Sequence, residues 1–350
     1  MKKSPLVSII MPTYNGLGHL EKCLPSLFKS THKNFELILI DNNSIDRSVE
    51  YVERKFPKVR VIKNSKNDGY AQGNNLGWEY VKGEYVLFLS NDTVVDKNFI
   101  GEMIKVLENS PELGGVQSKV FLMDDHSRLD SVGSFFTSTG FLYHYGANKK
   151  DAPKYNKEIF VYSAKGVCML FRKKVIKNVL LMGEIFDSSY FAYFEETDLC
   201  HRVWLSGWKI GYAPKSFIYH KVGGTSKSMD NSFIQYHSFK NRINSYCKNL
   251  DTLNLIKVLP LHLVLCELNA AVYLLRGKFR MALTVQRSIF WNILNLNTTI
   301  TKRRIVQDKI RKVKDKDIMP YIKKNVGLDY YVNLFSGLRQ YKEADISLRK

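Results

Sequence analysis

Short apolar runs alternate with segments of helical periodicity through the first two thirds of the chain. Strand-like runs cover residues 7–11, 35–40, 59–62 and 85–89. Between them, apolar residues recur three and four positions apart, as they do on one face of a helix. This alternation predicts a doubly wound α/β domain with a mostly parallel sheet. Each run ends on polar residues, and open α/β sheets bind ligands at the carboxyl ends of their strands.

Two of these strand ends carry a carboxylate that could bind a ligand. The run at 85–89 is apolar throughout, as in a strand buried on both faces, and stops at Ser90-Asn91-Asp92. Asp92 either holds a divalent metal or caps a helix expected over residues 97–108. Asp41, directly after the run at 35–40, either accepts hydrogen bonds from a base or ribose or forms an Asx turn before the next helix.

The stretch from 113 to 172 has weaker patterns. Residues 116–123 predict another strand, and residues 124–156 mix Gly, Ser, aromatic and charged residues with little periodicity. We interpret the latter as irregular loops and short strands, the kind of segment that carries substrate specificity. Residues 160–172 predict paired strands around a tight passage at Lys165-Gly166.

A dense cluster of acids and aromatics follows, at residues 186–202. Glu195, Glu196 and Asp198 fall in the first turn of an expected helix, where acids stabilise the helix dipole. Alternatively, one of them is a general base that faces the cleft. Strands at 209–214 and 217–220 then lead to His220, and a lone His after an apolar strand is more often structural than catalytic.

Several classes of site are excluded by missing motifs. No GxGxxG follows the first run and no GxxxxGK[ST] occurs, which argues against a dinucleotide-type Rossmann domain and a Walker-type phosphate loop. The five cysteines have unrelated spacings, without a CxxC or Cys/His metal pattern, and we expect reduced thiols. A zinc or disulfide framework is therefore not expected.

The last third of the chain is helical in pattern and strongly basic. The formal net charge is +20, and residues 226–350 contain 23 Lys and Arg against 9 Asp and Glu. Amphipathic segments from residue 232 onward either pack on the rest of the protein or a second copy of it, or lie on an anionic membrane surface. No recognition-helix or zinc-finger pattern indicates nucleic acid. No uninterrupted apolar run reaches 18 residues, so we expect no spanning helix.

Six motifs, in order, resemble family 2 glycosyltransferases of the GT-A fold, particularly their rhamnosyltransferase-like branch. They span residues 6–226 and comprise residues 7–15, 41–46, 67–77, 87–93, 193–202 and 214–226. The resemblance implies an α/β GT-A catalytic domain at 1–228 and a basic helical region at 229–350. It implies a metal-dependent inverting glycosyltransferase that moves a sugar from a UDP- or dTDP-sugar to a hydroxyl of a glycan or lipid-linked glycan.

The resemblance also implies roles for individual positions. The implied catalytic base is Glu196, with Glu195 as the other candidate, and Mg²⁺ or Mn²⁺ would be held by Asp92 and His220. The acceptor would meet Lys165, Gly166 and Asp198. The implied donor-binding residues are Pro12, Thr13, Tyr14, Asn15, Asp41, Asn43, Asn67, Gly69, Asn74, Asn91 and Asp92. Two departures stand out: Ser90-Asn91-Asp92 keeps one carboxylate of a DxD-like motif, and Glu196 stands where Asp is usual.

We therefore expect a cytoplasmic enzyme of cell-surface polysaccharide assembly. It would lie peripherally on the inner face of the cell membrane and could form homo-oligomers. A sugar nucleotidyltransferase is one alternative, but Asn15-Gly16-Leu17-Gly18 lacks the basic residues that such an enzyme needs after its first strand. A catalytically inactive nucleotide-sugar-binding relative is the other alternative.

Overall fold

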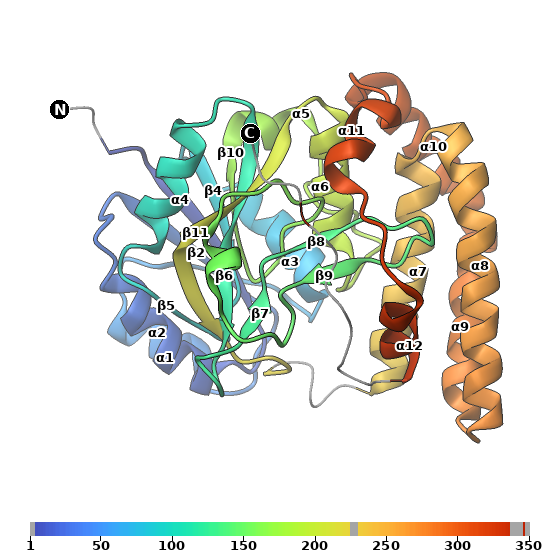
Figure 1. The fold of residues 1–350 in the computed structure, drawn as a ribbon. Coiled ribbons are helices and arrows are strands. Elements are labelled where there is room, and N and C mark those ends of the chain that lie inside the picture. Colours follow the sequence, from blue (N-terminus) through green and yellow to red (C-terminus); the bar gives the residue numbers. More distant parts are fainter. Residues whose placement is uncertain (1–3, 225–229, 337–345, 347–350) are drawn as a thin grey trace.

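The computed structural model describes residues 4–224, 230–336 and 346, and Figure 1 shows its fold. A nine-stranded sheet runs in the order β3-β2-β1-β4-β10-β6-β11-β5, with β7 beside β6, and β8 pairs with β9 separately. The strands are β1 Val7–Thr13, β2 Phe35–Asp41, β3 Arg60–Lys63, β4 Tyr85–Leu89, β5 Thr93–Val95, β6 Leu113–Leu122, β7 Leu129–Ser131, β8 Gly133–Phe135, β9 Tyr143–Tyr145, β10 Cys168–Arg172 and β11 Lys209–His220.

Helices cover the sheet and make up most of residues 230–336. They are α1 Leu17–Phe28, α2 Ser48–Lys55, α3 Gly69–Trp78, α4 Phe99–Glu108, α5 Lys173–Asn178, α6 Glu195–Leu205, α7 Asn231–Asn249, α8 Thr252–Leu275, α9 Phe279–Leu294, α10 Leu296–Arg304, α11 Asp315–Ile322 and α12 Leu328–Ser336. A 3-10 turn, η1 Pro153–Asn156, and a π-helical segment, η2 Ile305–Ile310, complete the elements.

The sheet is mostly parallel, as predicted. β3, β2, β1 and β4 run parallel, so their carboxyl ends meet at one edge. β10 is antiparallel between β4 and β6, and β11 runs parallel to β6. Because side chains alternate along a strand, neighbouring residues such as Ile9 and Ile10 enter the cores on opposite faces of the sheet. Both faces are therefore buried, which accounts for the continuous apolar runs in the sequence.

Three elements differ from the predictions. The paired strands expected over 160–172 are wrong: only β10 forms, and residues 160 and 163 make isolated bridges to Gly211 and Ser134. The two strands expected over 209–220 are one strand, β11, with a register shift between Ala213 and Phe217. β5 was not predicted, because it is only three residues long.

The C-terminal helices pack against the α/β body. α7 contacts α6, and α10 contacts α7, while α8 and α9 form a hairpin on the far side of α7 in Figure 1. The boundary expected at residue 228 and the end of the last motif, at Ser226, lie outside the described residues.

We expected no spanning helix, and within the described residues α8 nevertheless meets the length and composition criteria for a membrane span. α8 has 24 residues, and its most apolar 18-residue window has a mean hydropathy of 1.8. By length and composition alone, the helix could therefore cross a membrane. Scattered polar residues such as Lys257 and Glu267 interrupt the run, which is why a search for uninterrupted apolar residues does not find it.

Candidate active site

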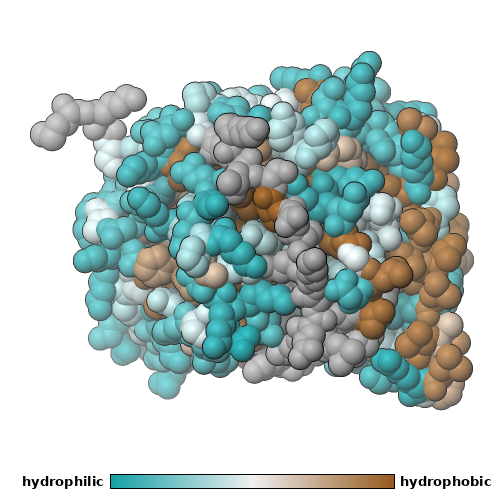
Figure 2. Space-filling view, in the orientation of Figure 1, coloured by the Kyte–Doolittle hydropathy of each residue, from teal (hydrophilic) through white to brown (hydrophobic). Residues whose placement is uncertain are grey.

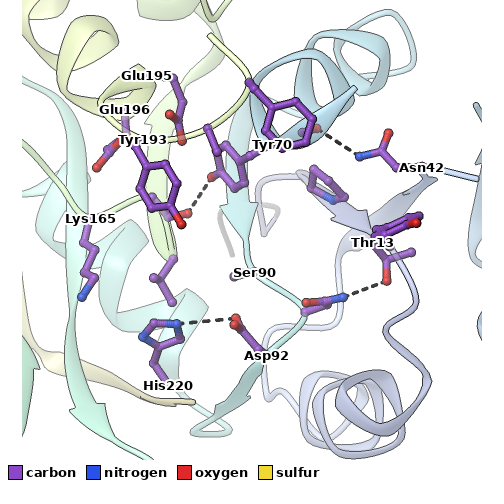
Figure 3. A pocket seen from close by; sticks show the side chains of 18 of the residues that line it. Thr13, Asn42, Tyr70, Ser90, Asp92, Lys165, Tyr193, Glu195, Glu196 and His220 are labelled. Carbon is purple, nitrogen blue, oxygen red and sulfur yellow. Dashed lines mark hydrogen bonds and ion pairs between the residues drawn. The ribbon is translucent and has the colours of Figure 1, made fainter. Parts of the chain in front are cut away.

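A cavity of about 280 Å³ opens at the carboxyl ends of β1 and β4. Figure 3 shows three groups of side chains around it: Thr13 and Asn42 on one side, Asp92 and His220 below, and Glu195 and Glu196 opposite. Its lining residues are Pro12, Thr13, Tyr14, Asn42, Asn67, Gly69, Tyr70, Ser90, Asn91, Asp92, Lys165, Gly166, Val167, Phe191, Ala192, Tyr193, Glu195, Glu196, His220 and Gly223.

Backbone and amide contacts fix the Thr13 side of the cavity. The Asn91 side-chain amide donates to the Thr13 hydroxyl at 2.7 Å, and the Asn42 amide donates to the Gly69 carbonyl oxygen at 3.0 Å. Gly69 has φ +77°, and a Cβ there would lie 2.3 Å from the Phe191 carbonyl oxygen. Only glycine fits this close approach, so the loop into α3 is held against the segment that leads to α6.

Asp92 lies in the turn between β4 and β5, so it does not cap α4, which begins seven residues later. Its Oδ1 is buried without a hydrogen-bond partner in the described part of the chain, and the His220 Nε2 lies 3.6 Å away. Burial opposes ionisation of Asp92, but His220 and Ser90 hold the pKa of its carboxyl below the usual value. An ionised carboxylate oxygen therefore faces the cavity, as a cation ligand would.

Asp130 is a site residue that the sequence analysis missed. Its carboxylate on β7 accepts from the His220 Nδ1 at 2.7 Å and from the Lys165 Nζ at 2.6 Å. Burial opposes ionisation of Asp130, but Lys165 and His220 lower the pKa of its carboxyl far below the ordinary value. Burial lowers the pKa of His220, yet the hydrogen bond to Asp130 and the nearby Asp92 raise it overall. Asp130 thus fixes the orientation of the ring, with Nε2 turned to Asp92.

Glu195 and Glu196 lie at the start of α6, after two residues in the left-handed region. Tyr193 and Phe194 have φ +70° and +74°, an unfavourable conformation for non-glycine residues that turns the chain sharply into the helix. Glu195 is buried, and its Oε2 has no hydrogen-bond partner among the described residues. Glu196 is half-buried on the cavity wall. The helix start expected near residue 195 is confirmed.

The two glutamates differ in their surroundings. Burial and the Glu196 charge raise the pKa of Glu195 well above the usual value. Burial also raises the pKa of Glu196, but hydrogen bonds from its own backbone and the Lys165 charge oppose that rise. Glu196 is therefore the more accessible of the two and the one with a stabilising cation nearby.

The structure brings most of the expected site residues together. Of the implied donor residues, Pro12, Thr13, Tyr14, Asn67, Gly69, Asn91 and Asp92 line the cavity, as do Lys165, Gly166, Glu195, Glu196 and His220. Asn42, Tyr70, Phe191 and Tyr193 line it as well but were not singled out from the sequence. The Tyr70 hydroxyl donates to the Gly166 carbonyl oxygen at 2.6 Å, which ties α3 to the Lys165-Gly166 passage.

Four expected donor residues lie behind or beside the cavity instead. Asp41 is buried, and its carboxylate accepts from the Ser44 backbone N–H at 3.3 Å. This local contact reaches three residues on, one further than the Asx turn predicted as its alternative role. Asn15 and Asn43 form exposed left-handed turns. Asn74 is buried, and its amide donates to the Tyr70 carbonyl oxygen.

Asp198 does not reach the cavity. Its side chain is buried, pairs with the Arg202 Nε at 3.1 Å and lies 3.2 Å from the Lys248 Nζ. Burial opposes its ionisation, but Lys248 and Arg202 hold the pKa of Asp198 below the usual value. The acceptor role implied for it from the sequence does not fit this position, because its carboxylate is enclosed by cations and has no path to a substrate.

Comparison with known proteins identifies the N-terminal half. Residues 8–180 match the sequence profile described as Glycosyl transferase family 2. The chain carries a family 2 glycosyltransferase domain. This confirms the family expected from the ordered motifs, while the rhamnosyltransferase-like branch stays a prediction.

Relatives of the family 2 domain include proteins of several bacteria. Glycosyltransferase GlyG of Streptococcus pneumoniae serotype 4 is 35% identical over 28% of this chain and 33% of its own length. An uncharacterized glycosyltransferase of Haemophilus influenzae is 35% identical over 31% of this chain and 36% of its own length. The match thus spans about a third of these relatives. The putative glycosyltransferase EpsH of Bacillus subtilis is 24% identical over 76% of this chain and 78% of its own length.

Solved structures share the fold. S. aureus TarS in complex with UDP-GlcNAc has a TM-score of 0.53 at 16% identity, over 73% of this chain and 71% of that one. The mannosyltransferase PcManGT from Pyrobaculum calidifontis, in complex with GDP-Man and Mn²⁺, has a TM-score of 0.53 at 15% identity, over 84% of this chain and 88% of that one. At these identities the likeness shows the fold alone, which is GT-A, as predicted.

Proposed function

We propose that this protein is an inverting, metal-dependent glycosyltransferase. It transfers a sugar from a nucleotide-diphosphate sugar, a UDP- or dTDP-sugar, to a hydroxyl of a glycan or lipid-linked glycan. The observation that carries the proposal is the cavity itself, where the Glu195–Glu196 pair faces Asp92 and His220. The complexes of TarS with UDP-GlcNAc and of PcManGT with GDP-Man support a nucleotide-sugar donor.

The residues at the base of the cavity fit a divalent cation. Asp92 presents a buried carboxylate oxygen without a partner among the described residues, and Asp130 holds His220 as second-sphere carboxylates hold metal-binding imidazoles. Asp92 and His220 would hold Mg²⁺ or Mn²⁺, which when bound neutralises the charge that grows on a leaving diphosphate. Among the described residues, no group of three acidic, His or Cys side chains is placed to hold a metal ion, so the donor's own oxygens would have to complete the coordination.

Glu196 would act as the general base. The acceptor hydroxyl is a poor nucleophile at neutral pH, and a carboxylate within reach can take its proton as the oxygen attacks the anomeric carbon. Glu195 is buried, so Glu196 is the more exposed candidate for that role. With one base, no covalent intermediate and attack opposite the leaving diphosphate, the configuration at the anomeric carbon inverts.

The Thr13 side of the cavity would bind the nucleotide, and Lys165 with Gly166 would lie toward the acceptor. The positions of Thr13 and Lys165 on opposite sides of Asp92 in Figure 3 support this division. The proposed setting is cell-surface polysaccharide assembly at the inner face of the cell membrane. There, a lipid-linked acceptor would be within reach of a peripherally bound enzyme.

A donor panel tests the proposal. The full chain would be incubated with UDP-, dTDP- and GDP-sugars, with Mg²⁺ or Mn²⁺, and release of nucleoside diphosphate would be measured. We expect one donor class to be hydrolysed slowly without acceptor, and this hydrolysis to stop with EDTA. Binding of a donor without any turnover would favour the inactive relative, and no binding of any donor would contradict the proposal.

A further inference from the structure

The α8–α9 hairpin has an apolar outer face that nothing in the described part of the chain covers. Along α8, one or two exposed residues occur in every turn from Thr252 to Leu275, and the helix is about 36 Å long at 1.5 Å per residue. They are mostly large and apolar: Leu253 (62% exposed), Ile256 (66%), Leu261 (42%), Val264 (56%), Leu268 (56%) and Leu275 (88%). Figure 2 shows these hydrophobic residues gathered on the flank that α8 and α9 form in Figure 1.

α9 continues the same surface. Its exposed apolar residues are Phe279 (70%), Leu283 (49%), Phe290 (57%), Ile293 (62%) and Leu294 (67%). Single exposed apolar side chains are common on soluble proteins, but a continuous face over two helices marks a surface that is covered in use. We call these exposed apolar residues of α8 and α9 together the hairpin face.

The opposite side of α8 is fixed to the α/β body. The buried His262 ring lies 3.0 Å, through Nδ1, from the Thr139 carbonyl oxygen and packs on Phe141 with ring centroids 4.6 Å apart. Val258 belongs to the main core. At the start of α8, the Asp251 backbone N–H donates to the Asp315 carboxylate at 2.9 Å. Because these contacts extend over half of the helix, α8 could cross a bilayer only by leaving the body.

The basic charge around the hairpin face favours an anionic lipid surface over a second copy of the chain as its partner. Within residues 252–294, the basic residues Lys257, Arg276, Lys278, Arg280 and Arg287 outnumber a single acid, Glu267. Arg280 is paired with Asp230 at 2.7 Å, and Glu267 accepts a hydrogen bond from Gln286. In a twofold dimer through the hairpin face, the unpaired basic residues around one copy of the face would approach those of the second copy and repel them. Anionic headgroups would instead attract them.

A groove of about 640 Å³ between α7 and α9 lies beside this face. Its lining includes Tyr236, Arg287, Phe290 and Trp291, an aromatic and cationic mixture that suits the headgroup layer. Phe233, also in the groove, packs on Phe191 of the catalytic cavity with ring centroids 5.3 Å apart. The groove and the cavity are thus separated by a single pair of rings.

We propose that the hairpin face docks in the plane of an anionic bilayer, with α8 lying in the interface rather than spanning it. The apolar side chains enter the acyl boundary, and the charges at the turn, Arg276 and Lys278, meet headgroup phosphates. The α7–α9 groove then faces the headgroups next to the catalytic cavity, which would give the site access to a lipid-linked acceptor. The substrate part of this inference rests on the proposed function, whereas the docking itself does not.

Vesicle flotation of the full-length protein tests the docking. Vesicles of phosphatidylcholine alone would be compared with vesicles containing phosphatidylglycerol as well. We expect the wild type to float with the anionic vesicles, and Val264→Glu/Leu268→Glu to lower the bound fraction at least about tenfold, because charges replace apolar groups in the acyl boundary. Met182→Glu is the matched control, since Met182 is 62% exposed outside the hairpin. Arg276→Gln/Lys278→Gln should remove the preference for anionic lipid.

Four results would overturn the inference. One is unchanged flotation of the Val264→Glu/Leu268→Glu variant, and another is a wild type that does not float. The third is resistance of bound wild type to extraction by alkaline carbonate, which would indicate a spanning helix. Sedimentation of the wild type as a dimer that this variant dissociates would assign the face to a second copy instead. Donor hydrolysis in solution should be equal in all variants, so its loss would reflect failure of the proposed enzyme function or of folding, separately from docking.

Discussion

Asp92 presents one buried oxygen to the cavity. His220, 3.6 Å away, is its ion-pair partner among the described residues, and the His19 charge acts on it more weakly. Two protein ligands are few for Mg²⁺ or Mn²⁺, which prefer about six. We therefore expect Mn²⁺ to bind weakly to the protein alone and at least about tenfold more tightly when UDP or dTDP is present, because diphosphate oxygens add ligands. Titration calorimetry with and without nucleotide measures this, with Asp92→Asn as the control. Tight Mn²⁺ binding by the protein alone would contradict it.

Glu196→Gln tests the assignment of the base. The amide keeps the size of the side chain but cannot accept the proton, so we expect transfer to fall by about 10²–10⁴ while the affinity for the donor stays near that of the wild type. Turnover with the cognate donor and acceptor, together with donor titration, separates the two effects. The matched variant is Glu195→Gln, at a buried neighbour whose pKa is also raised. If that variant lost activity while Glu196→Gln kept it, the two roles would be exchanged.

The pH dependence of transfer follows from the same residue. Burial raises the pKa of Glu196 above the ordinary value, and only the ionised form is a base, so kcat should fall as the pH decreases through that raised pKa. Lys165 opposes the rise in pKa, so Lys165→Gln should move the acidic limb to higher pH. A pH–rate profile of both proteins checks the direction. A limb that moved to lower pH would show that Lys165 does not stabilise the charge on Glu196.

At the scale of elements, buried charges join the C-terminal helices to the catalytic body. The Lys302 Nζ on α10 lies 2.5 Å from one Asp187 oxygen, and Lys248 on α7 pairs with the other. Lys248 also approaches Asp198 on α6. Burial opposes ionisation of Asp187, but Lys248 and Lys302 lower its pKa far below the ordinary value. The segment before α6 and its Glu195–Glu196 turn thus depend on cations that come from the last third of the chain.

Lys248→Met should therefore destabilise the whole protein. It leaves two buried carboxylates short of a counter-charge, and breaking a buried pair in this way costs about 3–5 kcal/mol. Urea unfolding measures the loss, with Lys215→Met at an exposed position as the control, for which we expect a change near zero. Because the pKa of Asp187 is lowered in the fold, its contribution to stability should be present near neutral pH and be lost as the pH falls. Equal stability of the two variants would contradict the argument.

The elements that the sequence predicted well are those whose pattern is local. β1, β2 and β4 are buried on both faces and read as continuous apolar runs, and the acids at 195–196 lie at a helix start. The role of Asp130 could not be predicted from a local pattern, because its hydrogen-bond partner His220 lies 90 residues later in the sequence. The partner of Asp187, Lys248, is 61 residues away. Ordered motifs located most of the cavity, whereas the second-sphere contacts depend on how the sheet folds.

At the scale of the whole molecule, the main hydrophobic core does not stop at the boundary expected near residue 228. The cluster that contains Ile10, Ile38 and Phe88 of the sheet also contains Tyr246 of α7 and Ile318 of α11. The division into a catalytic domain at 1–228 and a helical region at 229–350 remains our proposal for how the functions are separated. For stability, however, a shared core makes the two regions interdependent.

We therefore expect one cooperative unfolding transition for the full chain. Differential scanning calorimetry should give a calorimetric enthalpy close to the van't Hoff enthalpy, since neither region keeps its core when the other unfolds. Residues 1–228 alone should not fold stably: they would lose the apolar cover from α7 and α11 and the counter-charges of Asp187 and Asp198 at once. Two separate transitions, or a folded fragment 1–228 with native circular dichroism, would show independent domains. If the fragment did fold, the membrane docking of the hairpin could be tested by deletion, whereas a shared core requires surface substitutions such as Val264→Glu/Leu268→Glu.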